Sequence, residues 1–370
     1  MDKTSRGECP PPSYQMSDHA RSGQSSPVSA FSRAENLYSE MSRRHSISNE
    51  KWGQAAQAAK QGIVIVYSPV PLLQGRALQH WCDRLEAAML PWLSPLQFGH
   101  LQCFGSGEAA LKARCSRLLA RALLVRLVMA AAHMSQDTQG ADETDATKQK
   151  SHDPQLAWLS LEGLDMDYLG RPVLPGWRAA FSHSGQVAFC AVRYMGCENK
   201  SHQCQQSRNV QESQVQQDFR PCLAVDAESL TSLPPDPRAF SSKELNAPIA
   251  KNFQDRDALR RWTIKEALLK SAGLGLSRDP ALVHSGFSGQ RRGLMQFCRE
   301  GSTFFSSGKN YPGAAEPCRQ IGWQLVPCAG HWLCVAAPVH PGSALVVSGR
   351  PLRAHWRCIF QGLVESAGAD

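Results

Sequence analysis

The chain has 370 residues, of which 42% are hydrophobic and 19% charged, so it is long enough for a substantial hydrophobic core and is not a mini-protein. It carries 40 lysines and arginines against 32 acidic residues, which gives a formal charge of +8 at neutral pH. This balance favours acidic partners, whether phosphates, acidic proteins or nucleic acid, and does not choose among them.

The cysteines and the apolar runs indicate the compartment. The thirteen cysteines are odd in number and scattered, which is typical of free thiols in a reducing environment. The start of the chain lacks the pattern of a secretion signal. The most apolar long run, 118–132, is interrupted by Arg121 and Arg126, whereas a membrane span requires roughly 20 mostly apolar residues. We therefore expect a soluble, cytoplasmic protein without a membrane partner.

The first part of the chain predicts a tail, a strand and a long helix. Residues 1–50 are rich in Ser, Pro, Gly, Arg and Glu without a sustained period, which predicts a disordered tail. The β-branched run 62–67 predicts a buried strand that ends at Ser68-Pro69. After Gly105-Ser106-Gly107, apolar residues from Leu111 to Val125 recur at spacings of three and four, which predicts a long helix with one buried stripe. The simplest interpretation of its basic residues is a solvated helix face: Lys112, Arg114, Arg117, Arg121 and Arg126.

The rest of the chain alternates between predicted loops and regular elements. Three polar, aperiodic segments predict inserted surface loops at 135–155, 197–218 and 285–320. Apolar runs predict strands at 186–192, 222–225, 322–326 and 331–337. A helix is predicted over 255–272 and is closed by Gly273. This alternation favours an α+β fold.

Two carboxylates follow the predicted strand at 222–225. Asp226 and Glu228 are two residues apart, so in an extended chain their side chains share one face, with Cα atoms roughly 6.5 Å apart. Such a pair can converge on one hard cation, and Mg²⁺ is commonly bound by one or two carboxylates together with waters and substrate phosphates. The simpler alternative is an exposed strand end that carries two acids.

The predicted helix at 255–272 carries a second constellation. Trp262, Glu266 and Lys270 are four residues apart in succession and therefore share one helix face. The alternative is an ordinary ion pair between Glu266 and Lys270, worth about 0.2–0.5 kcal/mol, beside a core tryptophan.

A third constellation surrounds a histidine. Ser182-His183-Ser184-Gly185 is predicted to form a turn before the strand at 186–192, and Gly170-Arg171-Pro172 precedes it. A histidine flanked by two hydroxyl groups can donate a hydrogen bond to a phosphate oxygen. A local hydrogen bond within the turn is the alternative.

In this order, the three constellations resemble the signatures of the 4'-phosphopantetheinyl transferases of the larger, monomeric type, which activate carrier proteins of polyketide, peptide and fatty-acid synthesis. Ala224 stands where the family has glycine, Ala227 replaces a bulkier aliphatic residue, and the segment between the histidine and aspartate motifs is unusually long. The resemblance covers about residues 60–340. Its signatures are Gly170-Arg171-Pro172, Ser182-His183-Ser184, Val225-Asp226-Ala227-Glu228, and Trp262 to Lys270 followed by Gly273-Leu274-Gly275-Leu276.

The resemblance implies an α+β pseudo-dimer of two similar halves. Each half would have a small antiparallel sheet with a long helix, and coenzyme A would bind in the cleft between them. We then expect an N-terminal half over 60–195, a C-terminal half over 219–345 and a C-terminal extension over 346–370. The protein would be a monomer with internal pseudo-symmetry. Independently of the resemblance, no interleaving of aromatic and basic residues appears, so nucleic-acid binding is not expected.

The resemblance also implies a reaction and roles for its residues. The enzyme would be a holo-acyl-carrier-protein synthase, which moves 4'-phosphopantetheine from coenzyme A onto a serine of an apo carrier protein and releases adenosine 3',5'-bisphosphate. Asp226, Glu228 and Glu266 would hold Mg²⁺. Glu266, directly or through a water molecule, would accept the serine proton, and Lys270 would neutralise the departing nucleotide.

Other residues would bind the donor. The resemblance implies that His183 and Arg126 contact its phosphates, and that Arg171, Pro172 and Ser182 border the nucleotide.

Two other hypotheses remain open at this stage. The chain could keep the coenzyme A cleft and only bind coenzyme A or carrier protein, although the three carboxylates and the lysine argue against lost catalysis. A zinc site is the other hypothesis, although its spacing fits no strong template; it would use Cys190, Cys197, His202 and Cys204.

Overall fold

A computed structural model describes residues 49–103, 107–137, 163–167, 170–196, 221–247, 254–275, 278–297 and 320–367. The chain divides into two units, Met1–Arg44 and His45–Asp370, and every described residue lies in the second. The predicted tail up to residue 48 and most of the three predicted loops lie outside the described residues.

The first sheet has the strand order β12-β1-β5-β4. β5 pairs antiparallel with both β1 and β4, whereas β12 adds to β1 in parallel. The side chains of β1 alternate between two hydrophobic clusters, since Val64 and Val66 pack with the helices and Ile65 packs on the opposite face. The strands are β1 (Val64–Pro69), β4 (Trp177–Ser184), β5 (Val187–Tyr194) and β12 (Leu352–Arg353).

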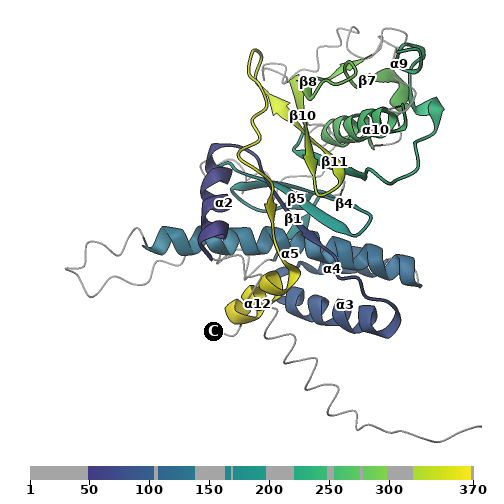
Figure 1. The fold of residues 1–370 in the computed structure, drawn as a ribbon. Helices are drawn as coiled ribbons and strands as arrows, with labels where there is room; N and C mark the ends of the chain where they lie inside the picture. Colours follow the sequence, from purple (N-terminus) through teal and green to yellow (C-terminus); the bar gives the residue numbers. More distant parts are fainter. Residues whose placement is uncertain are drawn as a thin grey trace, which may run out of the picture. The chain divides into compact units, whose positions relative to one another are not determined.

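Helices cover one face of this sheet. The long helix α5 (Glu108–Asp137) lies against β1, β4 and β5, and three further helices pack on it (Figure 1). Those three are α2 (Asn49–Gln61), α3 (Gly75–Met89) and α12 (Trp356–Ala367). Short elements complete this region: η1 (Leu90–Trp92), α4 (Pro95–Gln102), β2 (Asp165–Met166) and β3 (Pro172–Val173).

The second sheet has the strand order β6-β11-β10-β8 and is antiparallel throughout. Helix α10 (Gln254–Ser271) packs on β6, β10 and β11, as Figure 1 shows. The strands are β6 (Ala224–Ser229), β8 (Arg292–Leu294), β10 (Gln320–Cys328) and β11 (His331–Val339). The smaller elements are η2 (Pro237–Ala239), α9 (Ser242–Leu245), η5 (Pro280–Leu282) and the pair β7 (Val283–His284) and β9 (Gln296–Phe297).

Both sheets are built by the same succession of elements. In each, a first strand leads through a long helix to a hairpin, and the last strand of the hairpin pairs with the first strand. This gives the order β1-β5-β4 in one sheet and β6-β11-β10 in the other. The prediction of an α+β fold with small antiparallel sheets is therefore confirmed.

A hydrophobic cluster joins the two sheets. Ile65 and Phe189 of the first sheet pack with Val225 and Leu333 of the second. Because strand side chains alternate, Asp226 lies on the other face of β6 from Val225, toward α10. The edge strands β4 and β6 also contact each other.

Several predicted elements are confirmed, with shifted ends. The helix predicted at 255–272 is α10, and the strands predicted at 186–192, 222–225, 322–326 and 331–337 are β5, β6, β10 and β11. The long helix predicted after Gly107 is α5, which begins at Glu108, and the short helix α4 precedes it.

Other predictions require correction. His183 lies in β4 and not in a turn, because pairing with β5 continues to Ser184. The segment 285–297, predicted as a loop, contains β8 and β9. The C-terminal extension over 346–370 stays a prediction; its described residues include β12 and α12, and Ile359 and Leu363 of α12 pack in the core beside α5.

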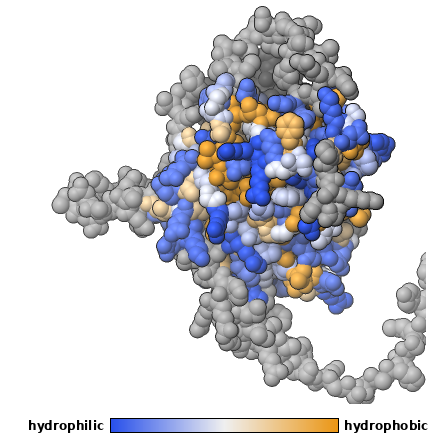
Figure 2. All heavy atoms as spheres, turned by 45° about the horizontal axis from the view of Figure 1, so that its top comes forward, coloured by the Kyte–Doolittle hydropathy of each residue, from blue (hydrophilic) through white to orange (hydrophobic). Residues whose placement is uncertain are grey.

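The described cysteines, helices and surface bear on the expectations drawn from the composition. The cysteines that the structure describes are free thiols, and none of the described helices combines the length and apolar character of a membrane-spanning segment. Figure 2 shows hydrophilic and hydrophobic residues intermixed on one face of the molecule.

Candidate functional site

The two acids of β6 point away from the cluster between the sheets. Val225 and Ala227 occupy that cluster, so Asp226 and Glu228 share the face that α10 covers. The Asp226 side chain is buried, with 3% of the residue exposed, and Glu228 is half-buried. The predicted shared face of the two acids is therefore confirmed, whereas the alternative of an exposed strand end is wrong for Asp226.

Helix α10 brings the other half of the cluster. Lys270 Nζ lies 2.5 Å from Asp226 Oδ1 and 3.8 Å from Glu266 Oε1. The shorter ion pair thus joins the helix to the strand, whereas the pair within the helix is the longer one. Trp262 lies on the same helix face, and its side chain hydrogen-bonds to Glu228. The predicted common face of Trp262, Glu266 and Lys270 is confirmed.

The three carboxylates converge. One oxygen from each of Asp226, Glu228 and Glu266 lies within 4.8 Å of the others. Asp226 Oδ2 is buried without a hydrogen-bond partner, and a buried polar atom of this kind is costly unless something binds it. Carboxylate oxygens are the ligands that Mg²⁺ prefers. The donor set and the unpartnered oxygen therefore fit a divalent cation.

The charges of the cluster act on one another. Burial raises the pKa of Glu266 to about 7, the carboxylates of Asp226 and Glu228 act in the same direction, and Lys270 opposes them. Burial and Asp226 also raise the pKa of Glu228. Burial lowers the pKa of Lys270, but Asp226 and Glu266 outweigh it, so that pKa lies above its ordinary value. With a pKa of about 7, Glu266 is about half protonated at neutral pH when no cation is bound.

The raised pKa of Glu266 predicts a pH-dependent stability. A raised carboxyl pKa means that the folded protein binds a proton more tightly than the unfolded chain, so this stabilisation is complete below about pH 4.5 and disappears as the pH rises through 7. Without Mg²⁺, Glu266→Gln should therefore become more stable relative to the parent between pH 5 and 8, by on the order of 2–3 kcal/mol. Urea unfolding of both proteins at several pH values measures this difference, and parallel pH profiles would contradict it.

Local structure holds α10 in place. Asp255 and Asp257 in its first turn complement the helix dipole. At its other end Gly273 adopts φ 72°, Gly273 N–H donates to Lys270 O, and Leu274 N–H donates to Leu269 O, a Schellman cap that favours glycine.

A buried ion pair fixes the back of the helix. Lys265, 0% exposed, donates from Nζ to Glu244 Oε2 at 2.7 Å, Pro280 O at 2.8 Å and Val283 O at 2.7 Å. Glu244 in turn accepts from both N–H and Oγ–H of Ser285. Glu266 and Lys270 therefore project from a helix whose other side is fully hydrogen-bonded.

His183 lies on β4 among positive charges. Burial lowers its pKa to about 4, and Arg117, Lys270 and Arg121 act in the same direction. Its imidazole is therefore neutral at pH 7 and has one N–H to donate. β4 contacts β6, and Ser184, the residue after His183, accepts a hydrogen bond from Ser229, the residue after Glu228. The sequence motifs alone did not establish this proximity.

The structure identifies two arginines beside His183 that sequence reasoning assigned to a solvated face. Arg121 is 4% exposed, donates to Gln97 Oε1 at 2.6 Å and lies over the Phe181 ring at 5.2 Å. Arg117 and Arg121 are one helical turn apart, so they share a face of α5. The four-residue spacing of Arg117 and Arg121 showed in the sequence that they share a helix face. That this face lies against β4, which carries His183, follows only from the packing of α5 on β4.

The other predicted donor residues occupy separate positions. Arg171 precedes β3, pairs with Asp167 through Nε at 2.5 Å and contacts the Cys222 thiol next to β6. Pro172 lies in β3, and Ser182 is buried in β4. Arg126 is buried in α5, about 140° around the helix from Arg121, so its phosphate contact stays a prediction.

Of the four residues in the zinc hypothesis, the structure describes only Cys190. Cys190 is fully buried in β5, and burial raises the pKa of its thiol above the usual range. Cys197, His202 and Cys204 lie outside the described residues.

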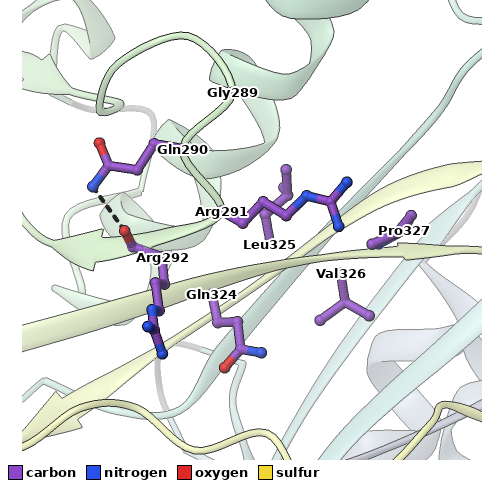
Figure 3. A pocket seen from close by; sticks show the side chains of 8 residues that line it. All are labelled: Gly289, Gln290, Arg291, Arg292, Gln324, Leu325, Val326 and Pro327. Carbon is purple, nitrogen blue, oxygen red and sulfur yellow. Dashed lines mark hydrogen bonds between the residues drawn. The ribbon is translucent and has the colours of Figure 1, made fainter.

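A hollow lies elsewhere on the second sheet. It has a volume of about 580 Å³ at β8 and β10, where Arg292 and Gln324 lie side by side and Arg291 extends over β10 (Figure 3). None of the residues that line it belongs to the carboxylate cluster or contacts His183. Its shape therefore does not identify the site; the chemistry of the cluster does.

Comparison with known proteins agrees with the carboxylate cluster. Residues 222–316 match the family model of the 4'-phosphopantetheinyl transferase superfamily, so this part of the chain is a domain of that superfamily. The match includes β6 and α10, which carry all three carboxylates and Lys270. A search of curated proteins found no match to the chain.

Proposed function

We propose that the chain, whose residues 222–316 form a domain of the 4'-phosphopantetheinyl transferase superfamily, is a holo-acyl-carrier-protein synthase of the larger, monomeric type. It would transfer 4'-phosphopantetheine from coenzyme A to a serine of an apo carrier protein. The observation that carries the proposal is the buried cluster of Asp226, Glu228, Glu266 and Lys270 with His183 beside it. The shared succession of elements in the two sheets supports a pseudo-dimer within one chain.

In this proposal the donor lies at the edge where strand β4 of the first sheet contacts strand β6 of the second. His183 donates to a donor phosphate, and Arg117 and Arg121 provide the positive charge that attracts it. Arg171, Pro172 and Ser182 border the nucleotide, and Arg126 remains a further candidate for phosphate contact. In a partly dry site these charges act more strongly than they would in water.

Asp226, Glu228 and Glu266 would hold Mg²⁺, which supplies neutralisation of the diphosphate charge when it is bound. Glu266 accepts the proton of the carrier serine as its oxygen attacks the β-phosphorus of coenzyme A. The phosphoanhydride bond breaks, and Lys270 stabilises the charge of the departing adenosine 3',5'-bisphosphate. Glu266 lies in the cluster beside the other two carboxylates, and a general base must be within hydrogen-bond reach of the proton that it removes.

Replacing His183 should affect the donor more than the carrier. His183→Ala removes a hydrogen bond to a charged phosphate, worth about 1.5–3 kcal/mol, so we expect the KM for coenzyme A to rise about tenfold or more. The KM for the carrier protein should stay within about twofold. Steady-state kinetics with each substrate varied in turn measures both constants, and equal changes in the two would contradict the assigned contact.

A non-catalytic module that binds coenzyme A or carrier protein is the alternative. The two functions differ in a product, because only the transferase releases adenosine 3',5'-bisphosphate as coenzyme A is consumed. Chromatography of the nucleotides after incubation with Mg²⁺, coenzyme A and apo carrier protein tests this. Release that requires the carrier supports the transferase, whereas bound but unconsumed coenzyme A supports the module.

Two further properties belong to the proposal. We infer a monomer, because one chain supplies both sheets. The free thiols of the described cysteines support a cytoplasmic location.

A further inference from the structure

The ends of β4 and β6 meet at Ser184, Ser229 and His331. β4 and β6 belong to different sheets, so within the described residues no backbone ladder joins them. Instead, Ser229 N–H donates to Ser184 Oγ at 2.9 Å, and His331 Nε2 lies 3.0 Å from Ser184 O. We call Ser184, Ser229 and His331 the serine–histidine junction.

His331 is held firmly at this junction. The residue is 6% exposed and pairs across the second sheet with Ser229. Its Nδ1 lies 2.7 Å from Ala329 O, and its ring meets the Phe189 ring edge to face at 5.3 Å between centroids. Carbonyl oxygens only accept hydrogen bonds and a neutral imidazole carries one N–H, so the ring donates to one of the two carbonyls, which is Ser184 O in the Nε2–H tautomer.

The junction lies directly beside the proposed reaction residues. Ser184 follows His183 in the chain, and Ser229 follows Glu228. The turn at Gly185, with φ 57°, is left-handed and favours glycine, and it presents the Ser184 carbonyl oxygen to His331. A change at the junction therefore acts directly on the strand ends that carry His183 and Glu228.

We propose that the serine–histidine junction sets the distance between His183 and the carboxylate cluster, and that His331 is a positioning residue for the transfer. The proposal rests on the proposed function, because it takes one donor molecule to contact both sites at once. A donor that spans two sites is bound and oriented well only at one separation, and a displacement of about 1 Å can lower a rate about a hundredfold.

Two substitutions at one position separate the contacts of His331. A glutamine amide nitrogen takes the place of Nε2 and can still donate to Ser184 O, whereas an asparagine amide nitrogen takes the place of Nδ1 and reaches only Ala329 O. We expect His331→Asn to lower kcat/KM for coenzyme A about tenfold or more, with the carrier KM unchanged. His331→Gln should recover kcat/KM to within about threefold of the parent.

The result that overturns the proposal is equal kcat/KM for coenzyme A in folded His331→Asn and His331→Gln. If His331→Asn does not fold, Ser184→Ala takes its place, since it removes the Ser229 contact, and kcat/KM equal to that of the parent overturns the proposal.

A measurement without substrate separates this proposal from the proposed function. Ser184→Ala should speed hydrogen exchange of the Ser229 amide, observed by NMR, about tenfold or more relative to the parent. Unchanged exchange overturns the junction alone. If exchange of the Ser229 amide is faster in Ser184→Ala, as expected, but the parent protein performs no transfer, the proposed function is overturned and the positioning role with it.

Discussion

Glu266→Gln should lower the rate of phosphopantetheinyl transfer by at least about two orders of magnitude while the protein remains folded, because removal of a general base alone has this scale. The substitution keeps the side-chain volume and removes the charge that both the cation and the serine proton require. Glu266 lies in the cluster with Asp226 and Glu228, and burial raises its pKa to about 7. Single-turnover transfer at saturating coenzyme A and carrier protein measures the effect.

A matched control comes from the other long helix. Glu108 pairs with Lys112 at i,i+4 on the exposed surface of α5, so Glu108→Gln removes the same kind of charge from a similar helical pair. An exposed pair of this kind contributes about 0.3–0.5 kcal/mol or less, and its loss should leave transfer unchanged. Transfer by folded Glu266→Gln within about tenfold of the parent would remove Glu266 from the reaction.

Asp226→Asn should abolish most of the cation affinity and lower transfer by about two orders of magnitude, a barrier increase of roughly 2.7 kcal/mol. Asp226 presents the unpartnered buried oxygen Oδ2 to the cluster and pairs with Lys270 through Oδ1. Both interactions depend on its charge. The neutral amide should also lower the pKa of Glu266 toward its ordinary range, since the charge of Asp226 raises it.

Calorimetric titration with Mg²⁺ checks the binding part of this prediction, and transfer at raised Mg²⁺ checks the kinetic part. Asp236→Asn is the control, because Asp236 is an exposed acid that pairs with Arg238 outside the cluster. Unaltered Mg²⁺ affinity in folded Asp226→Asn would assign the cation to other residues.

Local spacing was sufficient to predict much of the carboxylate cluster. A two-residue spacing on a strand placed Asp226 and Glu228 on one face, and four-residue spacing on a helix aligned Glu266 with Lys270. Spacing could not show that the two faces oppose each other, because that depends on how α10 packs on β6. The family signatures supplied this connection before the structure did.

Local sequence patterns could not predict the contacts between segments that are far apart in the chain. Ser182-His183-Ser184-Gly185 is rich in turn-forming residues, yet pairing with β5 extends the strand to Ser184 and leaves the turn to the residues after it. Arg121 resembles a surface residue in a helical pattern, but Phe181 and Gln97 bury it.

His331 belongs to no motif, and its role depends on a segment 147 positions earlier in the chain. The sequence of helix α12 contains a helical spacing of apolar residues. Ile359 and Leu363 are four residues apart and lie in the core of the first sheet. The pairing of β12 with β1, which the sequence did not predict, also holds this segment against the first strand.

The intact mass of an apo acyl carrier protein, measured after incubation with the purified protein, coenzyme A and Mg²⁺, tests the proposed function most directly. We predict a mass gain of one 4'-phosphopantetheine group on a serine of the carrier, which is absent when Mg²⁺ is chelated or when Glu266→Gln replaces the parent. A carrier mass that stays unchanged with folded parent protein and both substrates present would contradict the proposed transfer.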